Sequence, residues 1–238
     1  IPAALGDLPF LQELSLHKLP NVTGPIPSEI TKLKHLTSLT LDFLNVSGPI
    51  PSFLSQLKNL TSLNLAYNKL SGSIPGELGS LPNLQSLYLS RNSLSGSIPS
   101  ALGDLKTTSI YIDLSHNQLT GEIPTSFNNL NLASIDLSWN KLEGDASMLF
   151  GPNKTIATVI LDRNQLAFNL STVVFPSGFT NLDIDHNKIY GSLPPQLAEL
   201  SLQFLNVSYN RLCGEIPVGG RLQSFDIYEY LHNKCLCG

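Results

Sequence analysis

Leucines and other apolar residues recur along this chain with two superimposed spacings. Over a few residues, two leucines flank one variable residue, as in Leu63-Asn64-Leu65 and Leu87-Tyr88-Leu89. Because side chains alternate along a β-strand, both leucines of such a segment point to one face and the residue between them points to the other. Over a longer distance, the pattern L-x-L-x-x-N-x-L-x-G-x-I-P returns every 23 to 25 residues. A sustained period of this length predicts structural repeats that stack on one another.

The asparagine of the pattern marks each repeat. Seven copies carry it, at Asn68, Asn92, Asn117, Asn140, Asn164, Asn187 and Asn210. Two earlier copies, with leucine pairs at Leu14/Leu16 and Leu39/Leu41, are less regular and bring the total to nine strand segments. The predicted fold class is α/β, a leucine-rich repeat solenoid. We expect a curved right-handed superhelix with a parallel concave β-sheet, short helical turns on the convex side and a second short sheet from the G-x-I-P segments.

The polar positions of the repeat have structural explanations. Asn suits the turn after the strand because its side chain bonds to backbone groups, and stacked copies are expected to form a ladder. Gly permits backbone angles that other residues resist, and Pro, which has no N–H to donate, ends a short strand. In the second copy Leu44 takes the place of the Asn, and in the first an extra residue near Pro20 displaces Asn21. The ladder is therefore expected to have defects near this end.

The pattern breaks in two later repeats. After Asn140 the G-x-I-P step becomes Gly144-Asp145-Ala146-Ser147, and after Asn164 the Gly is missing around Phe168-Asn169. We therefore expect the outer sheet to be interrupted over these two repeats. A structural irregularity is the simpler explanation, and a specialised contact site is the alternative.

The chain divides into residues 1–212, which form about nine repeats of 23–25 residues, and residues 213–238, which form a C-terminal cap. A cap is expected because the end of a stacked array would otherwise expose its core. This cap carries Cys213, Cys235 and Cys237, of which two can form a bridge while one is left over, and the aromatic residues Phe225, Tyr228 and Tyr230. The odd cysteine indicates a partner beyond Gly238. The first residues resemble the tail of a repeat, so we also expect a missing upstream segment.

Composition narrows the classes of function. The net charge of −4 argues against nucleic-acid binding, which needs a basic surface. No apolar run approaches the roughly 20 residues of a membrane span. Six Asn-x-Ser/Thr sequons indicate the secretory pathway and are the candidate N-glycosylation sites: Asn21, Asn45, Asn59, Asn153, Asn169 and Asn206.

Residues that flank the leucines are expected to form columns on the concave sheet. The middle column is Ser15, Thr40, Asn64, Tyr88, Asp113, Asp136, Ile160, Asp183 and Asn206. The column before the ladder Asn is Phe43, Tyr67, Arg91, His116, Trp139, Arg163, His186 and Tyr209. Between them we place Asp42, Ser90, Ser115, Ser138, Asp162, Asp185 and Ser208 on the same surface. Tyr, Trp and Arg are enriched at protein-binding hot spots, so this face is predicted to bind a protein; a solvated face without a partner is the alternative.

Catalysis is not expected, although paired carboxylates can hydrolyse glycosides at the right separation. The carboxylates lie on an open face that would not exclude water. The sequence has no nucleophile elbow, phosphate loop or zinc signature. His116 and His186 recur at one repeat position, so surface filling explains them. We predict neither an enzyme nor a cofactor or metal site.

Several segments resemble the polygalacturonase-inhibiting proteins of plants. They are residues 54–61 (LSQLKNLT), 142–147 (LEGDAS), 204–217 (FLNVSYNRLCGEIP), 219–226 (GGRLQSFD) and 232–238 (HNKCLCG). The resemblance covers essentially the whole chain and includes the irregular Gly144-Asp145 step, which a generic repeat would not share. The cysteine-rich N-terminal cap of that family is absent here. By this resemblance Cys213 pairs with Cys235, and Cys237 pairs with a cysteine beyond the chain.

The resemblance implies a secreted inhibitor of fungal endopolygalacturonases in the plant cell wall, which binds the enzyme through the concave face and has pectin as a further ligand. A polygalacturonate-binding cleft must be basic, and a ring of carboxylates could dock against it. The expected charge patch is Asp113, Asp136, Asp162, Asp183 and Asp185, and the expected anchors are Tyr88, Trp139 and Arg163, with Arg91 and His116 beside them.

Two other functions remain open. One is the ectodomain of a receptor that binds a peptide or hormone, in which case a membrane span should follow the cap. The other is ice binding, since a carrot relative carries this scaffold. Ice binding would need a flat, repetitive array of Thr, Ser or Asn, whereas these columns are mixed and charged.

Overall fold

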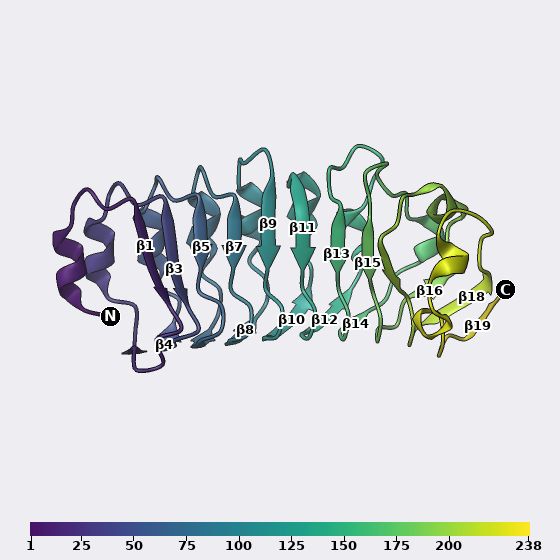
Figure 1. The fold of residues 1–238 in the computed structure, drawn as a ribbon, viewed down its shortest axis with the longest axis horizontal. Coiled ribbons are helices and arrows are strands. Elements are labelled where there is room, and N and C mark those ends of the chain that lie inside the picture. Colours follow the sequence, from purple (N-terminus) through teal and green to yellow (C-terminus); the bar gives the residue numbers. More distant parts are fainter.

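The computed structural model describes the backbone of residues 1–238 and every side chain except that of Ala3. One strand from each repeat enters a parallel nine-stranded sheet, in sequence order, which runs the length of the elongated molecule (Figure 1). Its strands are β1 (Glu13–His17), β3 (Ser38–Asp42), β5 (Ser62–Asn64), β7 (Ser86–Tyr88), β9 (Ile110–Asp113), β11 (Leu132–Asp136), β13 (Thr158–Ile160), β15 (Asn181–Asp183) and β17 (Phe204–Asn206). The predicted solenoid with nine strand segments is confirmed. The outward side of this sheet is called the concave face below.

A second sheet lies beside the first and is built from the residues after the ladder Asn. It contains β2 (Thr23–Gly24), β4 (Asn45–Pro49), β6 (Lys69–Gly72), β8 (Ser93–Gly96), β10 (Gln118–Glu122), β12 (Lys141–Gly144) and β14 (Gln165–Leu166). With the exception of β14, these strands end at the Gly of the G-x-I-P step or one residue beyond it. The second sheet thus comes from the segment leading into that step, because the Gly turns the chain with a positive φ, as at Gly72 (78°).

The outer sheet breaks one repeat later than the pattern predicts. Strand β12 is complete and pairs with both β10 and β14, so the expected interruption at the Asn140 repeat is wrong. Gly144 keeps a φ of 78° there, which is the conformation that the strand end requires. The break follows β14, and the outer strands resume in a separate sheet of β16 (Tyr190–Gly191), β18 (Arg211–Glu215) and β19 (Cys235–Cys237).

Short 3-10 helices return the chain along the opposite side. In the repeats they are η1 (Ala3–Asp7), η2 (Ser28–Lys32), η3 (Ser52–Gln56), η4 (Gly76–Ser80), η5 (Ser100–Asp104), η6 (Thr125–Asn129), η7 (Ser147–Leu149), η8 (Leu170–Thr172) and η9 (Pro195–Glu199). Most follow the Pro of the repeat, whose extended conformation precedes the first helical residue, as at Pro51 before η3. The irregular repeats have the three-residue η7 and η8. No helix in the described chain has the length and apolar character needed to cross a membrane.

The repeats share one continuous hydrophobic core with an asparagine ladder along it. The leucine pairs are fully buried, as at Leu63 and Leu65. The Nδ2 group of Asn92 donates to the carbonyls of Leu65 and Leu89, and its Oδ1 accepts the N–H of Leu70 in the preceding repeat. The same bonds recur at each ladder position from Asn68 to Asn210, which confirms the predicted ladder.

The ladder has the expected defect near the N-terminal end and an unexpected continuation at the other. At the second repeat Leu44 is buried in the Asn position, and Asn45 instead donates to the carbonyl of Pro20. In the cap, Asn233 donates to the carbonyls of Val207 and Tyr230 and accepts the N–H of Leu212. Its spacing of 23 residues from Asn210 is the ladder spacing, so periodicity alone could have identified it.

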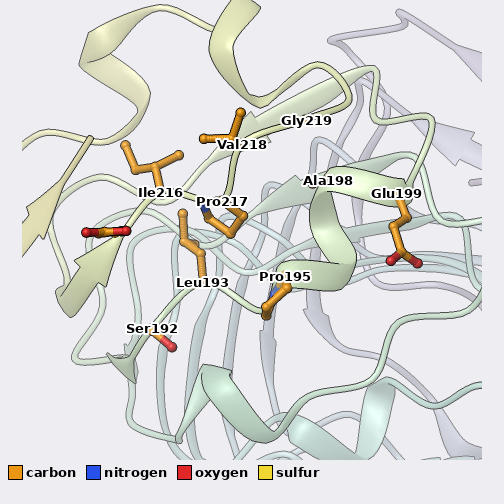
Figure 2. A pocket seen from close by; sticks show the side chains of 10 residues that line it. Ser192, Leu193, Pro195, Ala198, Glu199, Ile216, Pro217, Val218 and Gly219 are labelled. Atoms are coloured by element: carbon orange, nitrogen blue, oxygen red, sulfur yellow. The ribbon is translucent and has the colours of Figure 1, made fainter.

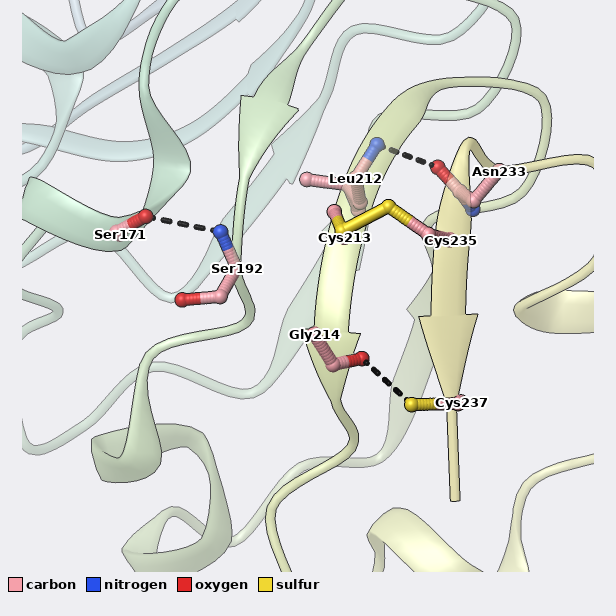
Figure 3. Close-up of a disulfide and its surroundings, with 8 residues drawn as sticks. All are labelled: Ser171, Ser192, Leu212, Cys213, Gly214, Asn233, Cys235 and Cys237. Atoms are coloured by element: carbon pink, nitrogen blue, oxygen red, sulfur yellow. Dashed lines mark hydrogen bonds between the residues drawn. A yellow bond between two sulfur atoms is a disulfide. The ribbon is translucent and has the colours of Figure 1, made fainter.

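A disulfide closes the C-terminal end. Cys213 on β18 is joined to Cys235 on β19, which confirms the pairing implied by the resemblance (Figure 3). Within the described chain Cys237 keeps a free, exposed thiol. The cap also contains η10 (Leu222–Ser224) and η11 (Ile227–Glu229), and the buried Tyr230 hydroxyl donates to the Leu222 carbonyl. Strand β18 runs across the expected domain boundary after residue 212, so the repeats pass into the cap without a gap.

The aromatic residues of the cap do not share one role. Phe225 is half-buried against the core and Tyr230 is buried in it, as expected of capping residues. Tyr228 also lies in the cap, but its side chain is exposed. Its position in η11 turns the ring to solvent, whereas Tyr230, just after the helix, turns inward.

Candidate protein-binding face

The residue before each ladder position has left-handed backbone geometry, including the first two repeats, in which a leucine follows it. Its φ lies between 48° and 60° at Lys18, Phe43, Tyr67, Arg91, His116, Trp139, Arg163, His186, Tyr209 and His232. Bulky side chains rarely adopt this conformation, which costs roughly 1–2 kcal/mol per residue. The surrounding bonds impose it here, because the adjacent peptide groups are paired with neighbouring repeats: the N–H of Trp139 donates to the carbonyl of Asp162, for example. The side chains consequently line up along one edge of the concave face.

These side chains stack on one another across the strands. The rings of Phe43 and Tyr67 stack at 3.8 Å between centroids, and the Arg91 guanidinium lies 5.1 Å from the Tyr67 ring. Parallel strands are about 4.8 Å apart, so equivalent flat side chains fall into contact without adjustment. The column is called the cation–aromatic stack below.

The stack continues through the middle of the face. A nitrogen of Arg91 lies 3.1 Å from His116 Nε2, and the His116 ring stacks on Trp139 at 5.0 Å. Arg163 covers the other side of Trp139, with its guanidinium 4.4 Å from the ring centroid. The indole of Trp139 remains 46% exposed, so an outer part of this central ring is free to contact a partner.

The carboxylates of the middle column both hold the turns after their strands and place charge on the concave face. Asp113 Oδ1 accepts from both the N–H and the hydroxyl of Ser115, and Asp136 makes the same pair of bonds with Ser138. One carboxylate oxygen of each residue therefore holds the turn at the end of its strand. The side chains remain half-buried, so they still place charge on the face.

Most side chains of the column between the middle column and the cation–aromatic stack are buried. Asp42, Ser90, Ser115, Ser138 and Ser208 are all buried, so their assignment to the binding surface was wrong. The hydroxyls of Ser115, Ser138 and Ser208 donate to side chains of the middle column, and Asp42 Oδ1 lies 2.8 Å from His17 Nδ1. Only Asp162 and Asp185 of this column remain half-buried and contribute to the face.

The five predicted carboxylates come together in one acidic patch. Asp113 and Asp136 are partners on adjacent strands, and Asp162, Asp183 and Asp185 have carboxylate oxygens within 4.8 Å of one another. Glu229 of the cap raises the pKa of Asp183 and extends the patch. The sequence offered no signal for Glu229 because it lies outside the repeat pattern. The expected absence of a metal site stays a prediction.

Burial governs how these groups titrate. Desolvation raises the pKa of Asp183 to about 7, helped by the charges of Asp162 and Asp185. Desolvation likewise raises the pKa of Asp162 to about 6, again with the neighbouring carboxylates adding to the effect. The pKa of Asp136 is raised by burial, against the opposing hydrogen bonds from Ser138. The patch therefore changes its charge at mildly acidic to neutral pH.

Other predicted residues fall where the columns place them, and two were overlooked. Tyr88 is half-buried beside Asp113, and desolvation and that charge raise the pKa of its hydroxyl. Tyr111 and Phe204 lie two residues before the middle column and are exposed. The same alternation that identified the middle column predicts this third outward position, so extending the pattern by two residues would have found them.

A groove lies on another part of the molecule. A groove of about 670 Å³ is lined by residues of η9 and of the segment after β18, including Pro195, Glu199 and Val218 (Figure 2). None of the concave columns contributes to it. The exposed rings of the concave face, such as Trp139 and Tyr67, lie outside this groove and are available to a macromolecular partner.

The comparisons with known proteins agree with the repeat geometry. Residues 34–94 match one leucine rich repeat family model, and residues 110–130 and 201–220 match another. Over its full length the chain is 66% identical to a polygalacturonase inhibitor of Pyrus communis, of which it covers 72%. It is also 66% identical, with the same coverage, to polygalacturonase inhibitor 1 of Arabidopsis thaliana. The chain belongs to the polygalacturonase inhibitor family. Members of this family are named as inhibitors of an enzyme.

Solved structures with this fold belong to plant proteins of several functions. A plant ice-binding protein matches all of this chain and 77% of its own, with a TM-score of 0.98 and 52% identity. The receptor kinase HAESA of Arabidopsis, in complex with a peptide hormone, matches 91% of this chain and 37% of its own, with a TM-score of 0.83 and 34% identity. The scaffold alone therefore does not select a ligand.

Proposed function

We propose that this protein inhibits fungal endopolygalacturonases by binding them as a protein partner through its concave face. The observation that carries the proposal is the full-length identity of 66% to proteins named polygalacturonase inhibitors. A face that carries the cation–aromatic stack and an acidic patch is also the kind of surface that binds a protein. We therefore expect the protein to inhibit an enzyme without having enzymatic activity of its own.

Charge supports a cationic partner. Asp113, Asp136, Asp162, Asp183 and Asp185 lie together, and Glu229 extends them. An enzyme that holds a polyanionic substrate needs a basic cleft, and complementary charge accelerates and orients association. The acidic patch would therefore face the substrate cleft of the enzyme.

The cation–aromatic stack supplies the anchor. Trp139 is held between His116 and Arg163 and keeps its outer edge exposed. A rigid, preordered ring loses little conformational entropy when it binds. Tyr88, Arg91 and the overlooked Tyr111 lie on the same face and would extend the contact area.

Inhibition of purified fungal polygalacturonases, followed by the release of reducing ends, tests the proposal. The double variant Asp136→Asn/Asp162→Asn removes two charges but keeps acceptors for the Ser138 bonds. It should weaken inhibition at least about tenfold and slow association most at low salt. Trp139→Asn removes the ring while placing a residue that tolerates a positive φ, and should also weaken inhibition at least about tenfold.

The matched control is Glu77→Gln/Glu122→Gln, which removes two charges from exposed positions on η4 and β10, away from the concave face. It should inhibit like the unaltered protein. Failure of the folded, unaltered protein to inhibit any enzyme of a broad fungal panel would refute the proposal, and equal losses in both double variants would refute the assigned face.

We also propose secretion to the plant cell wall, with pectin as a further ligand. Among the sequons, Asn21, Asn59 and Asn153 are exposed outside the concave columns and suit glycan attachment. Asn206 lies in the middle column, where its Oδ1 accepts from Ser208, and a glycan there would cover the binding face. Mass spectrometry of glycopeptides from plant-expressed protein should find Asn206 unmodified.

Ice binding and the binding of a peptide hormone by a receptor ectodomain have less support than inhibition. The plant ice-binding protein shares the scaffold, yet it is less similar in sequence (52%) than the inhibitors (66%). The concave columns here alternate rings, guanidinium groups and carboxylates, whereas ice binding would need one repeated polar group. Measurable thermal hysteresis would favour that alternative.

A further inference from the structure

We propose that Asp162, Asp183 and Asp185 form a proton-sharing carboxyl cluster that sets the charge of the concave face according to pH. The consequence for inhibition rests on the proposed function, whereas the cluster itself is a property of this chain alone. It would make the protein a stronger ligand for a basic enzyme at neutral pH than in acid.

The geometry brings the three groups together from two adjacent strands. Asp183 is the last residue of β15 and Asp185 follows it in the turn, while Asp162 follows β13 in the equivalent turn. One carboxylate oxygen from each lies within 4.8 Å of the other two. Like charges at this separation in a half-buried setting disfavour full ionisation, so one carboxyl tends to keep a proton.

One carboxylate oxygen of Asp185 has no hydrogen-bond donor in the part of the chain that the structure describes. Asp185 Oδ2 lies 2.8 Å from His186 Nδ1, whereas Asp185 Oδ1 is buried without a hydrogen-bond partner among the described residues. A buried acceptor without a donor is unfavourable. A proton on Asp162 or Asp183 would remove one of the negative charges that surround this buried oxygen and so relieve the repulsion within the cluster.

The charged groups around the cluster reinforce this arrangement on balance. The charge of Asp136 on β11 disfavours ionisation of Asp162, whereas the Arg163 guanidinium favours it. The charge of Glu229 on η11 disfavours ionisation of Asp183. Asp226 and Asp185 act in turn on Glu229, and desolvation with these charges raises the pKa of that carboxyl too. His186 lies beside the cluster, with its Nδ1 at 2.8 Å from Asp185 Oδ2.

The direction of the titrations agrees with the geometry. Burial, with the neighbouring carboxylates second, raises the pKa of Asp162 to about 6 and that of Asp183 to about 7. In mildly acidic surroundings the cluster therefore holds a proton and presents less negative charge. As the pH rises through this window, the proton is lost and attraction to a basic surface increases.

The first experiment follows the carboxyl carbons of ¹³C-labelled protein by NMR from pH 3 to 9, without any partner and with EDTA present so that no cation replaces the proton. Asp162 and Asp183 should titrate in steps above pH 5. In Asp185→Asn the other two midpoints should fall by about one pH unit or more, as expected for groups that interact. Titration of both Asp162 and Asp183 below pH 5 would overturn the proposal, and so would midpoints that do not move in this variant.

The second experiment measures association rates with a fungal polygalacturonase from pH 4.5 to 7.5 for the unaltered protein and Asp183→Asn. The ratio of the two rates cancels the titration of the enzyme itself. This ratio should rise about threefold across the range as the unaltered cluster ionises. A flat ratio beside a positive NMR result would refute the regulatory role, whereas a complete lack of inhibition would refute the proposed function and leave the cluster standing.

Discussion

At the scale of single residues, the carboxyl group of Asp183 shows a conflict between charge and burial. Its Oδ1 accepts the backbone N–H of Asp185, but the site removes it from water next to two other carboxyl groups. The raised pKa means that the folded protein binds more protons than the unfolded chain between about pH 4 and pH 7. Stability is therefore lost as the pH rises through this window.

Replacing the Asp183 carboxyl should remove this loss of stability at rising pH. Asp183→Asn keeps an acceptor for the Asp185 N–H and has no charge to bury. Its Tm should equal that of the unaltered protein at pH 4 and exceed it at pH 8, by about 2–4 °C for each kcal/mol gained in a protein of this size. Calorimetry at both pH values checks this, with Glu77→Gln as the exposed control. A Tm at pH 8 no higher than that of the unaltered protein would contradict it.

At the scale of elements, the ladder asparagines join each strand to the preceding repeat. Asn117 donates to the carbonyls of Leu89 and Leu114 and accepts the N–H of Leu94. Because these backbone groups point into the space between the sheets, water does not readily replace the side chain. Leu44 shows that an apolar residue can occupy such a position, but it does so only near one end of the array.

Removing a ladder asparagine from the centre should be costly. In Asn117→Ala at least one buried backbone group loses its partner, so unfolding by urea should show a loss of about 1–3 kcal/mol. Thr120→Ala, an exposed change on β10, should lie within about 0.5 kcal/mol of the unaltered protein. Equal effects of the two changes would show that the ladder does not contribute to stability.

At the scale of the whole molecule, stability depends on stacking, since each repeat contacts its neighbours. The terminal units are the weakest in such an array, and the Cys213–Cys235 bridge ties β19 to β18 at one end. The bridge spans 22 residues, a length for which chain entropy predicts a contribution of about 3 kcal/mol.

Loss of this bridge should therefore loosen the end before the centre. In Cys213→Ser/Cys235→Ser, hydrogen exchange should accelerate first in β17, β18 and β19, while β5 to β9 remain protected. Cys237→Ser, which leaves the bridge intact, should exchange like the unaltered protein. Uniform acceleration across all strands would instead indicate that the molecule unfolds as one cooperative unit.

The sequence by itself determined the solenoid, because each feature of the repeat depends on neighbours along the chain or at the fixed spacing of one repeat. The leucine pairs, the ladder and the number of strands follow from alternation and periodicity, and so does the alignment of the acidic residues in columns. The same periodicity extends to Tyr111 and Asn233. Family resemblance, and not spacing, identified the Cys213–Cys235 pair.

Only the tertiary structure decided which aligned side chains reach solvent and what surrounds them. It buried the serine column beneath the turn, moved the break in the outer sheet beyond β12 and brought Glu229 of the cap to the acidic patch. It also gave the residues before the ladder their left-handed geometry, and with it the continuous stack around Trp139. These features depend on depth and distance between repeats, which a one-dimensional pattern does not contain.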